Sequence, residues 1–395
     1  MLGVLDAREK RELFIKDFFK KNKGSLISIR SNYPGSDKIN PYTSYVSFVF
    51  LKLLKSEGWI EISKEFEAEG LIFMLHKNQI SSEAKKRALE LEDGHHLGRL
   101  SDIDVCGIDG QEHRKNARKC FLCEKNAVFC VRSEAHSPKE VAGFFKKTVE
   151  RYIFSKPYER IAEFSMISEL TRSISFGTVN FRTDGCHKDM SCESFCNSVS
   201  LLSPMFDELS ESLSYDEVKC LGLKMEAVMK KEIGVNTHQG LIFHLLLIFF
   251  ALFRAKSKEQ FRKNIILLGE RAVEDFKKEN ADYFENKIFG ARKSAKSGYA
   301  IVFEKTLPMF FDDLSVDKIF IALACETEDT NIFRRGGIEV LEKFRTLVSE
   351  IRDEGDLEKA EAFSVEKNIS AGGSADLLAV TTACFLIYKM KGWEV

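Results

Sequence analysis

Proline is scarce in this chain, with only 6 among 395 residues. Average usage of about 5% would give roughly 20. Because proline is the residue that most often ends a helix, its scarcity predicts long helices. The charges also show no excess of either sign, since 59 Lys and Arg stand against 60 Asp and Glu, a formal net charge of −1. That balance gives no electrostatic basis for a general binder of nucleic acid or of membrane surfaces.

A long apolar run and an export signal are also missing. The longest apolar run, residues 241–253, is shorter than the roughly 18 residues that a membrane span needs, so we expect a buried core helix there. Residues 1–23 are charged throughout and lack the apolar stretch of a secretory signal, so we expect a cytoplasmic protein with no membrane partner. The ten cysteines are then expected to be thiols or metal ligands rather than a disulfide framework.

The length suits two domains of different composition. In the first third, segments with strand-like alternation return between helical segments, which predicts an α+β unit. The expected strands are residues 25–29, 59–66, 71–76, 89–92 and 102–105. From about residue 138 onward the 3.6-residue periodicity of helices dominates, which predicts a mostly α-helical second domain. We place the domains at residues 1–145 and 146–395.

The densest polar cluster of the first domain is residues 95–105. Asp102 and Asp104 are two residues apart on an expected strand, so both carboxylates should point to the same face. Paired carboxylates suit Mg²⁺, which accepts one or two protein carboxylates together with phosphate oxygens. Such a metal can neutralise the charge that builds on a pyrophosphate leaving group. The alternative is a merely solvated strand face, and the preceding Gly98 and Arg99 favour the functional interpretation.

Cysteines, a histidine and arginines form a second cluster. Cys120 and Cys123 are spaced as Cys-x2-Cys, and Cys130 and His136 follow, so the four could complete a tetrahedral Cys3His zinc site. The alternative is that the cysteines are small buried apolar residues packing a hairpin. The guanidinium fork matches phosphate oxygens bidentately, so the arginines of this region are phosphate-binding candidates: Arg114, Arg118 and Arg132.

These two clusters together carry a resemblance. The pattern Gly98-Arg99-x-x-Asp102-Ile103-Asp104-Val105, followed by the arginines, cysteines and histidine above, resembles the phosphoribosyl-dephospho-CoA transferase of citrate lyase over roughly residues 5–140. That enzyme is also called the holo-acyl-carrier-protein synthase of citrate lyase. The resemblance implies that a serine hydroxyl of the apo acyl carrier (gamma) subunit attacks triphosphoribosyl-dephospho-CoA. A phosphodiester then forms and pyrophosphate leaves.

The same motif looks like the metal motif of nucleotidyltransferase folds. The resemblance therefore implies a nucleotidyltransferase-like mixed sheet in which Asp102 and Asp104 hold Mg²⁺. Arg99, Arg114, Arg118 and Arg132 are then the implied triphosphate contacts. Such folds commonly use a third carboxylate, which the sequence does not place.

Four glycine-bearing polar clusters interrupt the helices of the second domain: residues 185–190, 234–240, 329–337 and 371–377. Each comes before an apolar helix. Glycine lets the backbone approach a ligand, and a helix N-terminus attracts phosphate. The alternative for any one cluster is a helix cap and turn. Four together, three of them with an acidic residue, favour a metal–triphosphate site.

In the same order along the chain, these clusters resemble the triphosphoribosyl-dephospho-CoA synthase family over roughly residues 158–390. The resemblance implies that ATP is joined to 3′-dephospho-CoA and adenine is released, because a ribose 2′-hydroxyl attacks C1′ of the nucleoside. The implied catalytic residues are His187, Asp189, His238, Asp329 and Asp376. Three of these, Asp189, Asp329 and Asp376, are also the implied Mg²⁺ ligands. The implied nucleotide-binding residues are Asn236, Thr237, Arg292, Asn331, Gly372, Gly373 and Ser374.

Five positions depart from that family's pattern: Ser175, Asn180, Ser191, Gln239 and Ser294. They replace two lysines and three acids, and each lost charge-assisted contact is worth on the order of 1.5–3 kcal/mol. The leading interpretation is a bifunctional transferase that makes the prosthetic group of citrate lyase and attaches it to the carrier. One alternative is an active transferase fused to a decayed, scaffolding synthase-like domain. Another is a zinc-stabilised interaction protein without catalysis.

Overall fold

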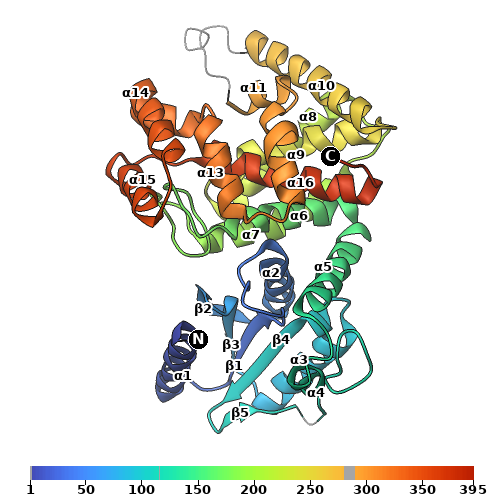
Figure 1. The fold of residues 1–395 in the computed structure, drawn as a ribbon, viewed down its shortest axis with the longest axis vertical. Helices are drawn as coiled ribbons and strands as arrows, with labels where there is room; N and C mark the ends of the chain where they lie inside the picture. Colours follow the sequence, from blue (N-terminus) through green and yellow to red (C-terminus); the bar gives the residue numbers. More distant parts are fainter. Residues whose placement is uncertain (1, 115, 280–289) are drawn as a thin grey trace. The chain divides into compact units, whose positions relative to one another are not determined.

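The computed structural model describes residues 2–114, 116–279 and 290–395 (Figure 1). The chain divides into two compact units, Met1–Ser155 and Lys156–Val395. An α+β first unit and an almost wholly helical second unit confirm the predicted fold class. The expected domain boundary at residues 145/146 falls inside a helix, Pro138–Phe154, that lies whole in the first unit.

The first unit is built on one five-stranded sheet. Its strands are β1 (Ser25–Ser31), β2 (Ile60–Glu67), β3 (Gly70–Lys77), β4 (Ser101–Gly107) and β5 (Gly110–Glu112). Its helices are α1 (Leu2–Lys21), α2 (Pro41–Ser56), α3 (Ser81–Gly94), α4 (Ala127–Arg132) and α5 (Pro138–Phe154), with a 3₁₀ turn η1 (Gly98–Leu100). The strand order is β2-β3-β1-β4-β5, and every pairing is antiparallel. The expected mixed sheet is therefore wrong in that detail, since these strands include no parallel pair.

The expected strand at residues 89–92 is also wrong, because these residues belong to α3. Ala84, Ala88 and Leu91 are buried at the spacing of one helix face, and α3 packs this face against β4 and β1. Helix α2 packs against β1 and β3. It begins with a capping box between Asn40 and Thr43.

Strand alternation decides which side chains of the sheet are available for chemistry. Ile29 on β1 pairs with Ile103 on β4, and both are fully buried. The next residue along β1, Arg30, points to the other face and stands opposite Asp102. The polar motif of β4 thus lies on the face away from these apolar residues.

The second unit contains helices packed around α16. Its elements are α6 (Pro157–Leu170), α7 (Cys192–Leu202), η2 (Ser203–Glu208), α8 (Tyr215–Ile233), α9 (Gln239–Phe253), α10 (Lys258–Glu279), α11 (Gly290–Lys296), η4 (Val302–Thr306), α12 (Leu307–Phe311), α13 (Val316–Glu326), α14 (Thr330–Ser349), α15 (Glu354–Glu366) and α16 (Gly372–Lys391). Helix α16 packs against α6, α9, α12 and α13. The apolar run predicted as a core helix forms most of the buried α9, as expected. Within the described residues, none of the helices has both the length and the apolarity to cross a membrane.

Candidate active sites

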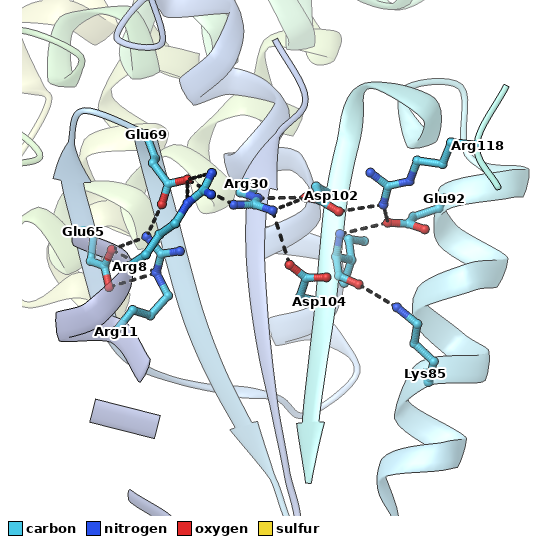
Figure 2. A network of polar contacts seen from close by, with 11 residues as sticks. Arg8, Arg11, Arg30, Glu65, Glu69, Lys85, Glu92, Asp102, Asp104 and Arg118 are labelled. Atoms are coloured by element: carbon cyan, nitrogen blue, oxygen red, sulfur yellow. Dashed lines mark hydrogen bonds and ion pairs between the residues drawn. The ribbon is translucent and has the colours of Figure 1, made fainter. Parts of the chain in front are cut away.

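A network of ion pairs is centred on β1 and β4 of the first unit (Figure 2). Arg30 donates to Asp102 Oδ2 from Nε at 2.8 Å and from Nη2 at 2.5 Å. Its Nη2 also lies 3.5 Å from Asp104 Oδ2. The two carboxylates therefore share one face of β4, and a guanidinium from the neighbouring strand lies between them. Arg30 was not among the residues selected from the sequence, because only the β1–β4 register places it there.

Glu92 joins this network to two of the predicted arginines. The side chain of Glu92 is almost fully buried on α3, and its Oε1 accepts hydrogen bonds from the Ile103 backbone at 2.9 Å and from Arg118 at 2.5 Å. Its Oε2 accepts from Arg114 at 3.0 Å. Arg118 also donates to Asp102 Oδ1 at 2.6 Å. Glu92 thus positions both arginines, a role that the sequence analysis missed.

At the other end of the network, Arg30 contacts the β2–β3 hairpin. Its Nη1 lies 3.3 Å from Glu69 Oε1. Glu69 also accepts from Arg8 at 2.9 Å and from Arg11 at 2.8 Å, both of α1 (Figure 2). The Arg30 guanidinium is therefore held by two acids, by Glu69 through Nη1 and by Asp102 through Nε and Nη2.

The pKa values of the two β4 carboxyls are displaced in opposite directions. Burial alone would raise the pKa of Asp102, but the charges and hydrogen bonds of Arg30 and Arg118 outweigh it and lower this pKa. The pKa of Asp104 is raised by burial and by the negative charge of Asp102. Like charges on one strand face therefore repel each other, and a bound cation would relieve that repulsion.

A cavity of about 570 Å³ lies beside this network. Three predicted triphosphate contacts, Arg99, Arg114 and Arg118, line it. Asp102 and Asp104 are not among its lining residues, although Asp102 contacts the lining residue Arg118. The fourth predicted arginine, Arg132, is exposed at the end of α4 and does not line the cavity.

The predicted zinc ligands come together at the wall of the same cavity. One ligand atom from each of Cys120, Cys123, Cys130 and His136 lies within 4.8 Å of the others. Across residues 2–114, 116–279 and 290–395, this is the only group of three or more histidine, cysteine or acidic side chains with such geometry. A third carboxylate for Asp102 and Asp104 is therefore not found in the described part of the chain.

The second unit holds a cavity of about 620 Å³ where α9, α14 and α16 begin. Nine residues implied by the resemblance line it: His187, Asn236, Thr237, Arg292, Asp329, Asn331, Gly372, Gly373 and Asp376. Asp189, His238 and Ser374 do not. Asp189 is exposed on a loop, whereas His238 and Ser374 are buried behind the wall. Arg334 and Arg335 add positive charge to the lining, although the motifs did not select them as site residues.

Asp329 is a helix cap within this site. Its Oδ1 accepts hydrogen bonds from the backbone of Asn331 at 2.9 Å and Ile332 at 3.4 Å, at the start of α14. Its Oδ2 accepts from the Ser374 backbone at 2.9 Å, at the start of α16. Both helix N-termini are thus satisfied by one carboxylate. The three implied Mg²⁺ ligands of this unit, Asp189, Asp329 and Asp376, do not form one ligand group among the described residues.

Glu169 is a buried acid in the cavity lining that the motifs did not reveal. It lies near the end of α6 and is 4% exposed, and its Oε2 has no hydrogen-bond partner among the described residues. Burial raises its pKa to about 7 against the lowering effect of Arg172. The sequence offers only one signal for Glu169, which is an acidic residue within a helical segment. That its neighbours in α6 are buried is known only from the structure.

Asp376 lies close enough to Glu169 to respond to its charge. The pKa of Asp376 is raised well above its ordinary value by burial and then by Glu169 and Asp329. A side chain at position 240 would collide with Asp376 Oδ2, so Gly240 is required for its approach to α9. Two acids that favour their protonated forms therefore face one cavity.

Both predicted catalytic histidines are neutral. His187 Nε2 lies 3.1 Å from Ser370 Oγ, and burial together with Arg335 lowers the pKa of His187. Burial lowers the pKa of His238 to about 3. His238 Nδ1 lies 2.9 Å from Ser198 Oγ, and its Nε2 has no partner among the described residues.

The five residues that replace the family's charged residues are themselves uncharged, and most of their hydrogen bonds are local. Gln239 Nε2 donates to Glu226 Oε2 at 2.6 Å, and Gln239 Oε1 accepts from Asn236 at 2.6 Å. Asn180 Oδ1 accepts from the backbone of Arg182 at 2.8 Å and Thr183 at 3.0 Å. Ser175, Ser191 and Ser294 each bond to backbone within their own loop or helix. Gln239 and Ser294 line the cavity, whereas Ser175, Asn180 and Ser191 do not, so two of the five lost charges are lost from the cavity lining.

Comparison with known proteins divides the chain as the structure does. Residues 1–152 match the family described as apo-citrate lyase phosphoribosyl-dephospho-CoA transferase. Residues 155–395 match the family described as ATP:dephospho-CoA triphosphoribosyl transferase.

Two similar curated proteins match this chain over almost its whole length. Protein CitXG of Haemophilus influenzae is 25% identical over 444 residues, with 96% of this chain and 94% of that protein covered. Protein CitXG of Leuconostoc mesenteroides subsp. cremoris is 25% identical over 451 residues, with 96% of each covered. The 2-(5''-triphosphoribosyl)-3'-dephosphocoenzyme-A synthase of Haemophilus ducreyi is 27% identical over 314 residues, covering 66% of this chain and 97% of that protein.

Proposed function

Because this chain belongs to the ATP:dephospho-CoA triphosphoribosyl transferase family and carries an apo-citrate lyase phosphoribosyl-dephospho-CoA transferase domain before it, we propose that it both makes and attaches the prosthetic group of citrate lyase. The second unit joins ATP to 3′-dephospho-CoA and releases adenine. The first unit then transfers the product to a serine of the apo acyl carrier subunit and releases pyrophosphate. The observation that carries the proposal is that each unit has its own cavity lined by residues suited to its step.

In the synthase step, the 2′-hydroxyl of dephospho-CoA attacks C1′ of the ATP ribose. The bond from C1′ to adenine breaks, the hydroxyl loses a proton and the adenine gains one. Displacement at such a carbon passes through an oxocarbenium-like transition state, for which paired carboxyl groups supply acid, base and electrostatic stabilisation. We assign these roles to the pair Glu169 and Asp376, one ionised and one protonated. The cationic rim of Arg292, Arg334 and Arg335 holds the triphosphate, which stays attached.

In the transferase step, the serine hydroxyl of the carrier attacks the phosphorus that bears the pyrophosphate, the bond to pyrophosphate breaks, and the hydroxyl proton passes to the pyrophosphate or to solvent. Arg99, Arg114 and Arg118 line the cavity and neutralise the phosphate oxygens. Arg30 and Arg118 currently occupy both oxygens of Asp102. Of these two, only Arg118 lines the cavity, so in this proposal Arg118 exchanges its Asp102 contact for phosphate oxygens when triphosphate binds, and one oxygen of Asp102 becomes accessible.

Asp102 and Asp104 suit Mg²⁺, because they share one strand face and because burial, together with the charge of Asp102, raises the pKa of Asp104. Mg²⁺ held there would neutralise charge on the leaving pyrophosphate, with phosphate oxygens completing its ligands. In the second unit, Asp189 is exposed and does not line the cavity, and Asp329 is engaged by backbone groups, so no step is assigned to a protein-held metal there.

The partners of this reaction sequence are ATP, 3′-dephospho-CoA and the apo acyl carrier subunit. ATP and dephospho-CoA are metabolites of the cytoplasm, so the proposal places the protein there. Nothing in the proposal calls for nucleic acid or a membrane.

Intact mass of the apo carrier, incubated with this protein, ATP, Mg²⁺ and dephospho-CoA, tests both steps at once. A gain equal to the phosphoribosyl-dephospho-CoA group, together with one adenine released per carrier modified, is the expected result. If the carrier gains mass only when triphosphoribosyl-dephospho-CoA is supplied ready-made, the second unit is a scaffold and the synthase half of the proposal is wrong. No modification under either condition would contradict the transferase half.

A further inference from the structure

The segment between β5 and α5 is poorly supported by apolar packing. Over its described residues, 113–114 and 116–137, the regular structure consists of one isolated β-bridge, Lys119 to Asn126, and the six-residue helix α4. Four of its apolar side chains are exposed: Leu122, Val128, Phe129 and Val131. A segment that buries so little surface of its own requires another source of stability, and a metal ion or a covalent crosslink is the usual one in small folds.

The thiol cluster lies at the centre of this segment, and its dimensions suit one metal ion. Zn–S and Zn–N bonds of about 2.3 and 2.0 Å in a tetrahedron place ligand atoms about 3.5–3.8 Å apart. Here Cys123 Sγ lies 3.5 Å from Cys130 Sγ and 3.4 Å from His136 Nε2. All four ligand atoms lie within 4.8 Å of one another, so binding requires only small side-chain adjustments.

The backbone around the cluster is arranged as in a metal-binding turn. The Cys120 N–H donates to Lys125 O at 2.8 Å, which closes a tight hairpin with Cys120 and Cys123 on it. The Leu122 N–H lies 3.5 Å from Cys120 Sγ, where it would stabilise a thiolate. Cys130 comes from α4, and His136 lies just before α5, so the four ligands join three separate elements.

The geometry points to a structural zinc ion bound by Cys120, Cys123, Cys130 and His136, which fixes this segment as one wall of the transferase cavity. Four protein ligands leave no open position, so the ion would be structural rather than catalytic. Thiolate and imidazole ligands in a tetrahedral set favour zinc over the oxygen-seeking Mg²⁺ of Asp102 and Asp104.

Two contacts connect the cluster to the phosphate-binding arginines. Arg99 Nη2 donates to the carbonyl of Cys120 at 2.6 Å, and its guanidinium lies 5.9 Å from the Phe121 ring centroid. The Arg118 carbonyl accepts from the Ala127 N–H at 2.8 Å, which ties Arg118 to the start of α4. Loss of the ion would therefore release Arg99 and Arg118 from their positions in the cavity wall. This positioning role depends on the proposed function, whereas zinc binding itself does not.

Metal analysis of the full-length protein, purified in the presence of zinc and without chelators, is the first test. We expect about one zinc ion per chain. Cys123→Ser should lose the zinc, and Cys220→Ser is the matched control because Cys220 is an exposed thiol of the second unit. His136→Cys keeps four ligands and should retain zinc, whereas His136→Ala should lose it. Zinc-free wild-type protein, or equal zinc in Cys123→Ser and Cys220→Ser, would overturn the site.

Activity then tests the positioning role separately. Removal of zinc from the wild-type protein should lower transfer of ready-made triphosphoribosyl-dephospho-CoA by about tenfold or more, and added zinc should restore it. Adenine release by the second unit should not change. Full transfer activity in zinc-free protein would overturn the positioning role. A protein that contains no zinc and is two mass units lighter, even when purified under reducing conditions, would have a Cys123–Cys130 disulfide in place of the metal site. That result would overturn the zinc proposal.

Discussion

Glu169→Gln should make the second unit more stable at pH 8 while removing its synthase activity. Glutamine has the same shape as glutamate but carries no charge. Burial raises the pKa of Glu169 from its ordinary 4.5 to about 7, so at pH 8 the folded protein holds a buried carboxylate whose Oε2 has no partner among the described residues. A tenfold change in proton affinity is worth about 1.4 kcal/mol, so ionised Glu169 costs the fold about 3 kcal/mol.

The sign of the pH dependence follows from the two pKa values. Below pH 4.5 the carboxyl is protonated in both the folded and the unfolded chain, so glutamate and glutamine should be equally stable. Between pH 4.5 and about 7 only the unfolded chain ionises readily, so the wild-type protein loses stability as the pH rises. Above about pH 7 the loss is complete, and the advantage of glutamine reaches its full value.

Urea unfolding at pH 5 and pH 8 measures this difference, followed by fluorescence of Trp393 in a Trp59→Phe background. Trp393 packs against Phe261 and Tyr388 and is the only tryptophan of the second unit. Glu208→Gln is the control, since Glu208 is a surface acid of the second unit that is paired with Lys224 and does not line the cavity. A Glu169→Gln protein that gains the same stability at pH 5 and pH 8, or loses stability at pH 8, would refute the argument. Adenine release should fall by about 10²–10⁴-fold in Glu169→Gln alone.

Three further changes separate the parts of the two sites. Asp102→Asn should abolish carrier modification and leave adenine release unchanged, measured by intact mass and by chromatography of adenine; modification at the wild-type rate would show that Asp102 is not at the transferase centre. Asp329→Ala removes the cap of α14 and the contact to the start of α16, so it should lower the free energy of unfolding by about 1–2 kcal/mol or more. Unchanged urea unfolding would contradict the stabilisation of both helices by Asp329. Gly240→Val should displace Asp376 and reduce adenine release, while the helical content of the protein, measured by circular dichroism, stays unchanged. Full activity would mean that the position of Asp376 is not critical.

Local patterns in the sequence predict most helices and strands well, but they predict poorly which helices and strands lie side by side. The helices of the second unit follow from periodicity, and the shared face of Asp102 and Asp104 follows from strand alternation. The strand expected at residues 89–92 is instead the end of α3, because a short apolar–polar run does not distinguish a helix from a strand without its partner. The order of the strands and their antiparallel direction depend likewise on which strands pair, and the sequence of one strand does not identify its partners.

The same limit explains which site residues were found. Motif residues such as Asp102, Arg118 and the four thiol-cluster ligands are recognisable from spacing. Arg30 and Glu169 are far from those motifs along the chain and reach their sites only in the fold, and Glu92 lies just before the first motif but was not part of its pattern. Each is a single charged residue within an otherwise ordinary element, so only burial and contact distinguish it from a surface charge. Asp329 shows the reverse case, where a motif residue is also a structural cap.

Asp102 of the first unit and the acid pair of the second unit have pKa values displaced in opposite directions, and the difference matches the roles that we propose for them. In the first unit, arginines hold Asp102 ionised and lower its pKa, as is needed for a group that must share a site with a cation and phosphate oxygens. In the second unit, burial raises the pKa of Glu169 and Asp376, as is needed for groups that exchange protons with a hydroxyl and a departing base. A metal-supported acid site would fail at proton transfer, because its carboxylates hold protons too weakly. The second cavity also has cations, Arg292, Arg334 and Arg335, but in the proposed synthase step the triphosphate stays attached and no phosphorus–oxygen bond breaks. Two steps of such different chemistry therefore require two separate cavities, and this chain provides both.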